Sequence, residues 1–261
     1  MTDIKNIPII LIHGFMSNES VWKIAKQFFT NNGHSKVYTF NYSGTTHHSI
    51  ANNARRLWKW LKAKNFETVI LIGHSMGGLV ARQLILEYSQ KVFKLVTLAS
   101  PHNGALMAIV CNNSFLNIPI PLPLHILKII CRGARSISDM APGSDFLMSL
   151  NGKSLFTYTK GNTLTYAIEK DEIVHNAHIT TAKQMIVSDT KTYKNKNIKK
   201  GISENHSAIL NKKEVLNNVL TFINTEYSII NAGPNLHSGS CENKLERNNT
   251  IHWDIPEGSP D

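Results

Sequence analysis

The chain has 261 residues, of which 42% are hydrophobic and 18% are charged, and its net charge at pH 7 is +10. This composition excludes a disordered or fibrous protein and is sufficient for one sizeable domain with a buried core. The basic residues are scattered along the chain, apart from a run at 191–200, and aromatic residues do not alternate with them. We therefore expect no nucleic-acid partner, and at most a peripheral contact with an anionic membrane.

The sequence shows no signal for export, for a membrane span or for a metal site. Its N-terminus lacks the layout of a signal peptide, and no apolar run reaches the roughly 18 residues that a transmembrane helix needs. Its cysteines, Cys111, Cys131 and Cys241, fit no metal-ligand spacing, although Cys111 and Cys131 could pair in an oxidising compartment. We expect a cytoplasmic protein with reduced thiols and no bound metal.

The first elements alternate between strand and helix. An apolar run at 8–12 predicts a buried strand, and apolar residues at helical spacing predict a helix over 18–30. Alternating β-forming residues predict a strand over 36–42, and a second helix is expected over 50–63. Strands and helices that alternate at these lengths predict an α/β fold, with a mostly parallel central sheet and helices on both faces.

The most informative stretch is the sequence Gly-His-Ser-Met-Gly at 73–77. A short apolar run at 69–72 precedes it, and helical spacing of apolar residues follows it to Tyr88. A strand, a sharp glycine-rich turn and a helix are the setting of a nucleophile elbow, which lifts a serine hydroxyl above the sheet. An ordinary strand-to-helix turn with a capping serine is the alternative. The flanking elements favour Ser75 as a nucleophile, which requires a histidine base and a carboxylate later in the chain.

A second motif, His13-Gly14-Phe15, follows the first predicted strand. This position after an early strand suits a backbone N–H that donates to the negative oxygen of a tetrahedral intermediate. We assign one such donor to Phe15 and the other to Met76, the residue after the nucleophile. His13 itself is interpreted as a structural histidine that ties down the loop, without a role in proton transfer.

The regular alternation stops after a strand predicted over 92–100. Residues 105–130 are apolar but contain Pro119, Pro121 and Pro123, which exclude one continuous helix. An apolar insertion at the edge of the sheet that carries the site predicts a lid over about 104–138, and core packing is the alternative. The candidate substrate-contacting residues of this lid are Ile118, Leu122, Leu124, Ile126 and Leu127.

The acid candidate follows a later strand. Residues 164–169 are rich in β-forming residues and predict a core strand, and Asp171 comes shortly after it. Because catalytic groups lie at the carboxyl ends of such strands, we predict Asp171 as the triad acid. Glu172 is the immediate alternative.

The base candidate is His206, on the loop before an amphipathic helix predicted over 213–225. This position completes the chain order of serine, acid and histidine that an elbow of this kind uses. His175 and His178 are the competitors, but they lie too close to Asp171 in the sequence.

The rest of the chain is less regular. We expect a last strand over 183–188. The stretch at 189–205 is long and basic for a loop, so the sequence leaves open whether it contains further structure. Residues 231–261 are rich in Asn, Gly, Pro and Ser and lack apolar periodicity, so they predict a C-terminal tail. The predicted organisation is one α/β domain over 1–230, which includes the insertion, followed by this tail.

Six segments share motifs with a known group of enzymes. They are PIILIHGF (8–15), VILIGHSMGGLVAR (69–82), LVTLASPHNGA (95–105), MAPGSDFLMSLN (140–151), DEIVH (171–175) and NHSAIL (205–210). Together they resemble the bacterial lipase-type α/β-hydrolases, the triacylglycerol lipase and esterase relatives that share motifs with the PGAP1-like hydrolases. The resemblance implies the α/β-hydrolase fold and a triad of Ser75, Asp171 and His206. It also implies oxyanion donors at Phe15 and Met76, and ester hydrolysis without a cofactor.

These observations predict a serine hydrolase that cleaves carboxylic esters through an acyl-enzyme on Ser75. The apolar insertion favours acyl lipids as substrates. Phospholipase, thioesterase or acyltransferase activity on the same triad remains open. The alternative from another class is a binding protein that has the α/β-hydrolase fold without catalysis.

Overall fold

The computed structural model describes most of one compact unit, Met1–Tyr227. The described residues are 3–42, 48–88, 91–105, 108, 134–154, 162–168, 171, 174, 189–193 and 206–225. The predicted tail at 231–261 lies outside these ranges, so the expected division of the chain into a domain and a tail stays a prediction.

A parallel sheet forms the centre of the described chain. Its strands are β1 (Ile9–Ile12), β2 (Val37–Phe40), β3 (Thr68–His74), β4 (Lys91–Leu98), β5 (Thr163–Ile168) and β6 (Asp189–Tyr193). They are ordered β2-β1-β3-β4-β5-β6, and every neighbouring pair is parallel. The order of strands reverses at β1 and β3, so the loops that follow these two strands diverge at a topological switch point. Open α/β sheets bind their ligands at such a point.

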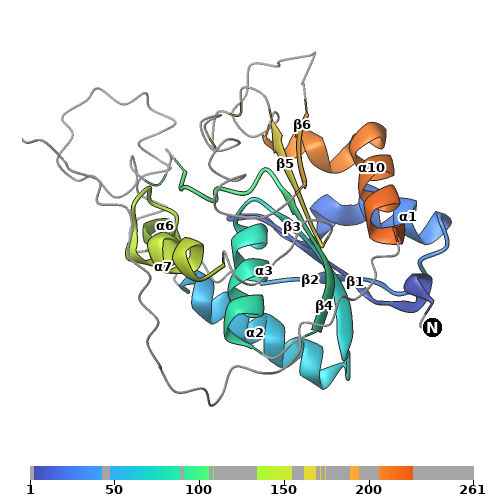
Figure 1. Cartoon of the computed structure of the whole chain (residues 1–261), viewed down its shortest axis with the longest axis horizontal. Coiled ribbons are helices and arrows are strands. Elements are labelled where there is room, and N and C mark those ends of the chain that lie inside the picture. Colours follow the sequence, from blue (N-terminus) through green and yellow to red (C-terminus); the bar gives the residue numbers. More distant parts are fainter. Residues whose placement is uncertain are drawn as a thin grey trace, which may run out of the picture. The chain divides into compact units, whose positions relative to one another are not determined.

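Helices cover both faces of this sheet (Figure 1), as the sequence predicts. Helices α2, α3, α6 and α7 lie on one side, and α1 and α10 lie on the other. No helix in the described ranges combines the length and the apolar character needed to cross a bilayer. The helices are α1 (Lys23–Asn31), α2 (Ile50–Ala63), α3 (Met76–Glu87), α6 (Arg135–Asp139), α7 (Asp145–Ser154) and α10 (Lys213–Asn224), with 3-10 turns η1 (Ile4–Asn6), η2 (Glu19–Trp22) and η3 (Ile209–Asn211).

Strand β1 shows why its sequence is apolar throughout. Ile10 and Ile12 pack into the core beneath α2 and α3, whereas Ile9 and Leu11 pack into the core beneath α1 and α10. All four side chains are fully buried, and each contributes roughly 1.5–3 kcal/mol to folding. A strand buried on both faces has no polar side, so its run of apolar residues is continuous rather than alternating.

Helix α2 occupies the residues that the apolar spacing predicts, and its start is capped twice. The Ser49 hydroxyl accepts a hydrogen bond from the Asn52 N–H at 3.1 Å, and the Asp139 carboxylate accepts one from the Ile50 N–H at 2.7 Å. These bonds satisfy N–H groups that have no partner within the helix. The second cap ties the segment before α7 to the start of α2.

Two elements differ from the simplest interpretation of the sequence. The segment at 189–205, where the sequence left further structure open, begins with β6, which pairs with β5 from Leu164↔Asp189 to Ile168↔Tyr193. This strand has no apolar stripe, so hydrophobic patterning could not identify it, although its Thr and Tyr residues favour β structure. The strand expected at 183–188 lies outside the described residues. The helix expected over 18–30 begins as the 3-10 turn η2, where the Asn18 side chain accepts from the Ser20 N–H, and becomes α-helical only in α1.

The borders of the predicted insertion belong to the core. Ala105 and Ala108 at one end and Ala134 and Ile137 at the other are all buried in the cluster beneath α2 and α3. The Ala105 N–H donates to the Met140 carbonyl at 2.8 Å, which ties the two ends together. For these border residues the core-packing alternative is correct. The lid candidates Ile118, Leu122, Leu124, Ile126 and Leu127 lie outside the described residues, so the lid stays a prediction.

Candidate active site

Ser75 is the single residue between β3 and α3, and the turn there is very tight. Its φ of 52° and ψ of −126° place it in a region that residues other than glycine rarely adopt. A β-carbon at Gly77 would lie 2.3 Å from the Ile12 carbonyl oxygen, and one at Gly78 would lie 2.1 Å from the Ser100 Oγ. Backbone therefore packs against backbone and against a serine, and this close approach is why the turn requires glycine.

Backbone hydrogen bonds hold the strained serine on both sides. The Ser75 N–H donates to the Leu98 carbonyl at 2.8 Å, and the Gly78 N–H donates to the Ser75 carbonyl at 3.0 Å. A conformation of this kind costs about 1–3 kcal/mol and persists only where the surroundings impose it. The serine is 8% exposed, at the carboxyl edge of the sheet.

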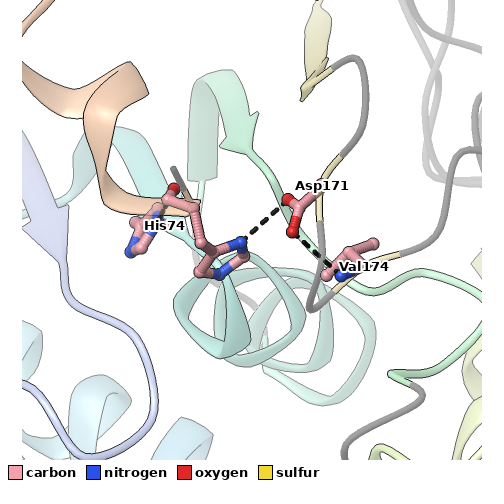
Figure 2. Close-up of polar contacts among 4 residues, drawn as sticks. His74, Asp171 and Val174 are labelled. Carbon is pink, nitrogen blue, oxygen red and sulfur yellow. Dashed lines mark hydrogen bonds and ion pairs between the residues drawn. The ribbon is translucent and has the colours of Figure 1, made fainter. Parts of the chain in front are cut away.

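Asp171 and His206 form a buried ion pair or hydrogen bond, although they come from distant parts of the chain. His206 Nδ1 lies 2.8 Å from Asp171 Oδ2. The other carboxylate oxygen of Asp171 accepts the Val174 N–H at 3.0 Å (Figure 2). The side chains of Asp171 and His206 are 2% and 6% exposed, respectively. Because a carboxylate can only accept, Nδ1 of the histidine carries a proton, and Nε2 of the neutral ring is left as an acceptor.

His206 also contacts the residue next to the serine. The rings of His74 and His206 have centroids 4.9 Å apart, and His74 Nε2 lies 3.1 Å from the His206 carbonyl oxygen. Within the described part of the chain, His206 Nε2 is buried and has no hydrogen-bond partner, so the Ser75 hydroxyl does not bond to it here. Hydrogen bonds of this kind are often long until a substrate binds.

His74 stays neutral because of its surroundings. Its pKa is lowered from 6.5 to about 3, mainly by burial and secondly by the neighbouring His206. A neutral ring whose Nε2 faces a carbonyl oxygen carries its proton on that nitrogen, so His74 donates to the backbone of His206. The sequence does not predict this contact, and its only local signal is the position of His74 inside the elbow motif.

The residues predicted as oxyanion donors belong to two segments that meet at the serine. Met76 is the first residue of α3, where N–H groups lack intrahelical acceptors and the helix dipole is positive. Phe15 follows Gly14, and a β-carbon on Gly14 would lie only 2.9 Å from the Ser75 Cβ. The loop after β1 therefore packs directly against the elbow.

A buried polar network beside the site was not predicted from the sequence. Arg82 on α3 lies 3.1 Å from His102 Nδ1 and donates to Asn151 Oδ1 on α7 at 3.0 Å. Asn151 in turn donates to the His102 carbonyl at 2.9 Å, and His102 Nε2 lies 3.1 Å from the Thr97 hydroxyl. These residues belong to three of the six segments with lipase-like motifs. The network links α3, β4 and α7 around the turn that follows β4.

The competing candidates are not described in the structure. Glu172, His175 and His178 all lie outside the described residues, so these alternatives stay open. No group of three or more His, Cys, Asp or Glu side chains that could hold a metal occurs in the described ranges.

Comparisons with known proteins identify similar sequences and a similar fold. A family model described as the alpha/beta hydrolase fold matches residues 7–117, which include β1, the elbow and β4. A pimeloyl-[acyl-carrier protein] methyl ester esterase of Vibrio atlanticus is 32% identical over 92 residues, which are 35% of this chain and 36% of that protein. A triacylglycerol lipase of Pseudarthrobacter phenanthrenivorans is 29% identical over 108 residues, which are 38% of this chain and 34% of that protein.

Among solved structures, the carboxylesterase CesB of Bacillus subtilis superimposes with a TM-score of 0.60 at 16% identity, and the match covers 84% of each chain. At this identity the likeness concerns the fold alone. In sequence, the chain spans about a third of the length of the curated relatives it matches. These findings confirm both the predicted fold class and the resemblance to bacterial lipases and esterases.

The close approach at the elbow predicts a large effect of one methyl group. We expect Gly77→Ala to destabilise the fold by several kcal/mol, because its β-carbon would lie 2.3 Å from the Ile12 carbonyl oxygen and 2.6 Å from that of His13. The matched control is Gly152→Ala, an exposed position in α7 where nothing lies within 4 Å of a β-carbon. This control should be neutral or stabilise by up to about 1 kcal/mol. Urea unfolding measures both, and equal stabilities for the two variants would contradict the packing at the elbow.

The lowered pKa of His74 predicts a pH dependence of stability. Between about pH 3 and pH 6.5 the unfolded chain binds a proton at His74 that the folded chain does not. The free energy of unfolding should therefore fall as pH drops through this window, by up to about 1.4 kcal/mol per pH unit from this group. The unfolding free energy, measured by urea titration between about pH 4 and pH 7, should depend less steeply on pH in His74→Gln than in the wild type. Parallel slopes would contradict the neutral, buried state of His74.

Proposed function

We propose that this chain, which has the α/β-hydrolase fold, is a serine hydrolase that cleaves carboxylic esters through an acyl-enzyme on Ser75. One observation carries the proposal: the buried pair of Asp171 and His206 at 2.8 Å, with His206 packed against the residue next to a strained serine. The esterase and lipase names of the relatives support the same class of reaction.

The first half of the reaction acylates the enzyme. His206 Nε2 removes the proton from the Ser75 hydroxyl as the Ser75 Oγ attacks the carbonyl carbon of the ester. Asp171 holds the imidazole through Nδ1 and stabilises its positive charge. His206 then gives the proton to the leaving alcohol as the bond between carbonyl carbon and alcohol oxygen breaks, which leaves an ester on Ser75.

The second half of the reaction restores the free enzyme. His206 removes a proton from water, the water oxygen attacks the acyl carbon, and the proton returns to the serine oxygen as the acid departs. In both halves the tetrahedral intermediate has a negative oxygen. We assign its donors to the N–H groups of Phe15 and Met76, each worth on the order of 3 kcal/mol. This chemistry uses only the chain's own residues and water.

For the substrate, we propose acyl esters, including lipids. The apolar residues of the insertion and the relatives that are named triacylglycerol lipases favour an acyl chain, and the net charge of +10 is suited to an anionic lipid surface. Methyl esters on a carrier protein are the substrates named for other relatives, so the assays should include short and long acyl groups.

Ser75→Ala should abolish ester hydrolysis while the fold is retained. We expect kcat on p-nitrophenyl esters to fall by at least about 10³-fold, because no other group replaces the nucleophile. The matched control is Ser20→Ala, which removes the hydroxyl of an exposed residue in the 3-10 turn η2 and should leave kcat unchanged. A Ser75→Ala variant that turns over substrate at the wild-type rate would exclude the mechanism. A wild type without activity on any ester would favour the binding-protein alternative.

Asp171→Asn should lower kcat by about 10²–10⁴-fold and change KM little, because an amide can favour the wrong tautomer of His206. Asp145→Asn, an exposed aspartate at the start of α7, is the matched control and should behave like the wild type. Steady-state kinetics on the same ester measures both variants. An undiminished kcat in Asp171→Asn would assign the acid elsewhere, with Glu172 as the next candidate.

A further inference from the structure

His13, at the end of β1, is buried and has three polar neighbours. Its Nδ1 lies 2.8 Å from the Gly14 carbonyl oxygen, its Nε2 accepts the Tyr42 N–H at 3.1 Å, and the same Nε2 lies 3.2 Å from Asn41 Oδ1. Burial is the main cause that lowers the pKa of His13, so the ring is neutral and carries one proton.

Two of these contacts decide where that proton is. With the proton on Nδ1, the ring donates to Gly14 and accepts from Tyr42, and the side-chain amide of Asn41 can turn its NH₂ group toward Nε2. With the proton on Nε2, two N–H groups would face each other at Tyr42, and a lone pair would face the Gly14 oxygen. The first arrangement satisfies both backbone partners, Gly14 and Tyr42, so His13 Nδ1–H donates to the Gly14 carbonyl.

The ring itself is held firmly in place. The Tyr42 ring stacks on it with centroids 4.1 Å apart and an interplanar angle of 15°, and the Tyr42 hydroxyl donates to the His13 carbonyl. Tyr42 is buried, which raises its pKa, so this hydroxyl keeps its proton. Tyr42, which lies shortly after β2, therefore fixes the position of His13, which directly follows β1.

This hydrogen bond orients one peptide unit of the site. A trans peptide directs its C=O and its N–H in opposite directions. Because the Gly14 carbonyl points to the His13 ring, the N–H of Phe15 in the same peptide unit points away from that ring. Gly14 packs against the elbow, since its β-carbon would lie 2.9 Å from the Ser75 Cβ and 3.2 Å from His74 Nδ1.

We propose that His13 is a positioning residue for the oxyanion hole: its Nδ1–H holds the Gly14–Phe15 peptide so that the Phe15 N–H faces the oxyanion formed at Ser75. This inference rests on the proposed ester hydrolysis. His13 itself does not touch the reacting atoms and transfers no proton. Its loss would let the peptide rotate and would weaken a donor whose complete removal costs about 10²–10³-fold in kcat.

The test compares two amides at position 13. In His13→Asn the side-chain NH₂ lies close to the place of Nδ1 and can still donate to Gly14, whereas in His13→Gln the amide reaches the place of Nε2 instead. We expect His13→Gln to lower kcat on p-nitrophenyl butyrate about 10–100-fold with KM within about twofold of the wild type. His13→Asn should keep most of the wild-type kcat. The affinity for butylboronic acid, whose serine adduct is tetrahedral, should fall in parallel with kcat.

The control is His34→Asn, which replaces another buried histidine. His34 bonds to Asn224 of α10 and precedes β2, so it lies at the amino ends of the strands, away from the site. This variant should lower the melting temperature and leave kcat unchanged. The proposal is wrong if His13→Asn and His13→Gln have equal kcat, or if His13→Gln loses only thermal stability and keeps its affinity for the boronic acid. A wild type that shows no Ser75-dependent hydrolysis would be a different result, because it would contradict the proposed function and not only the role of His13.

Discussion

The direct packing of backbone against backbone beneath Ser75 is the constraint on which the site depends. Helix α3 approaches the end of β1 so closely that a side chain at Gly77 has no room. The same approach brings the loop after β1 against the serine, so a single contact positions both the proposed nucleophile and one proposed oxyanion donor. The parallel order of the strands makes this contact possible, because β1 and β3 are neighbours and both end at the carboxyl edge.

Burial gives the histidines around this contact different roles. His13 and His74 have lowered pKa values and donate to backbone carbonyls, so each orients a piece of chain without a change of charge. His206 differs because a buried carboxylate lies 2.8 Å from its Nδ1 and can stabilise a positive ring. Of these three rings, His206 is the only one paired with an acid in the described part of the chain.

Local patterns predicted the fold well, and contacts between distant residues account for what they missed. The apolar spacing at 50–63 predicted α2 without error, and the glycine-rich turn after a short apolar run predicted the junction of β3 and α3. Strand β6 was not predicted because its sequence has no apolar stripe. The polar network was not predicted because Arg82 lies 20 residues from His102 and 69 residues from Asn151, and these residues share no periodicity. The catalytic roles assigned from the sequence stay predictions.

The central claim is that Ser75 is a nucleophile activated by His206, and covalent labelling tests it most directly. A fluorophosphonate probe should modify the folded protein at one residue, and peptide mass spectrometry should locate the adduct on Ser75. The rate of labelling should fall by at least about tenfold in His206→Gln, because the hydroxyl then lacks its base. An adduct on another residue, or equal labelling rates with and without His206, would contradict the account.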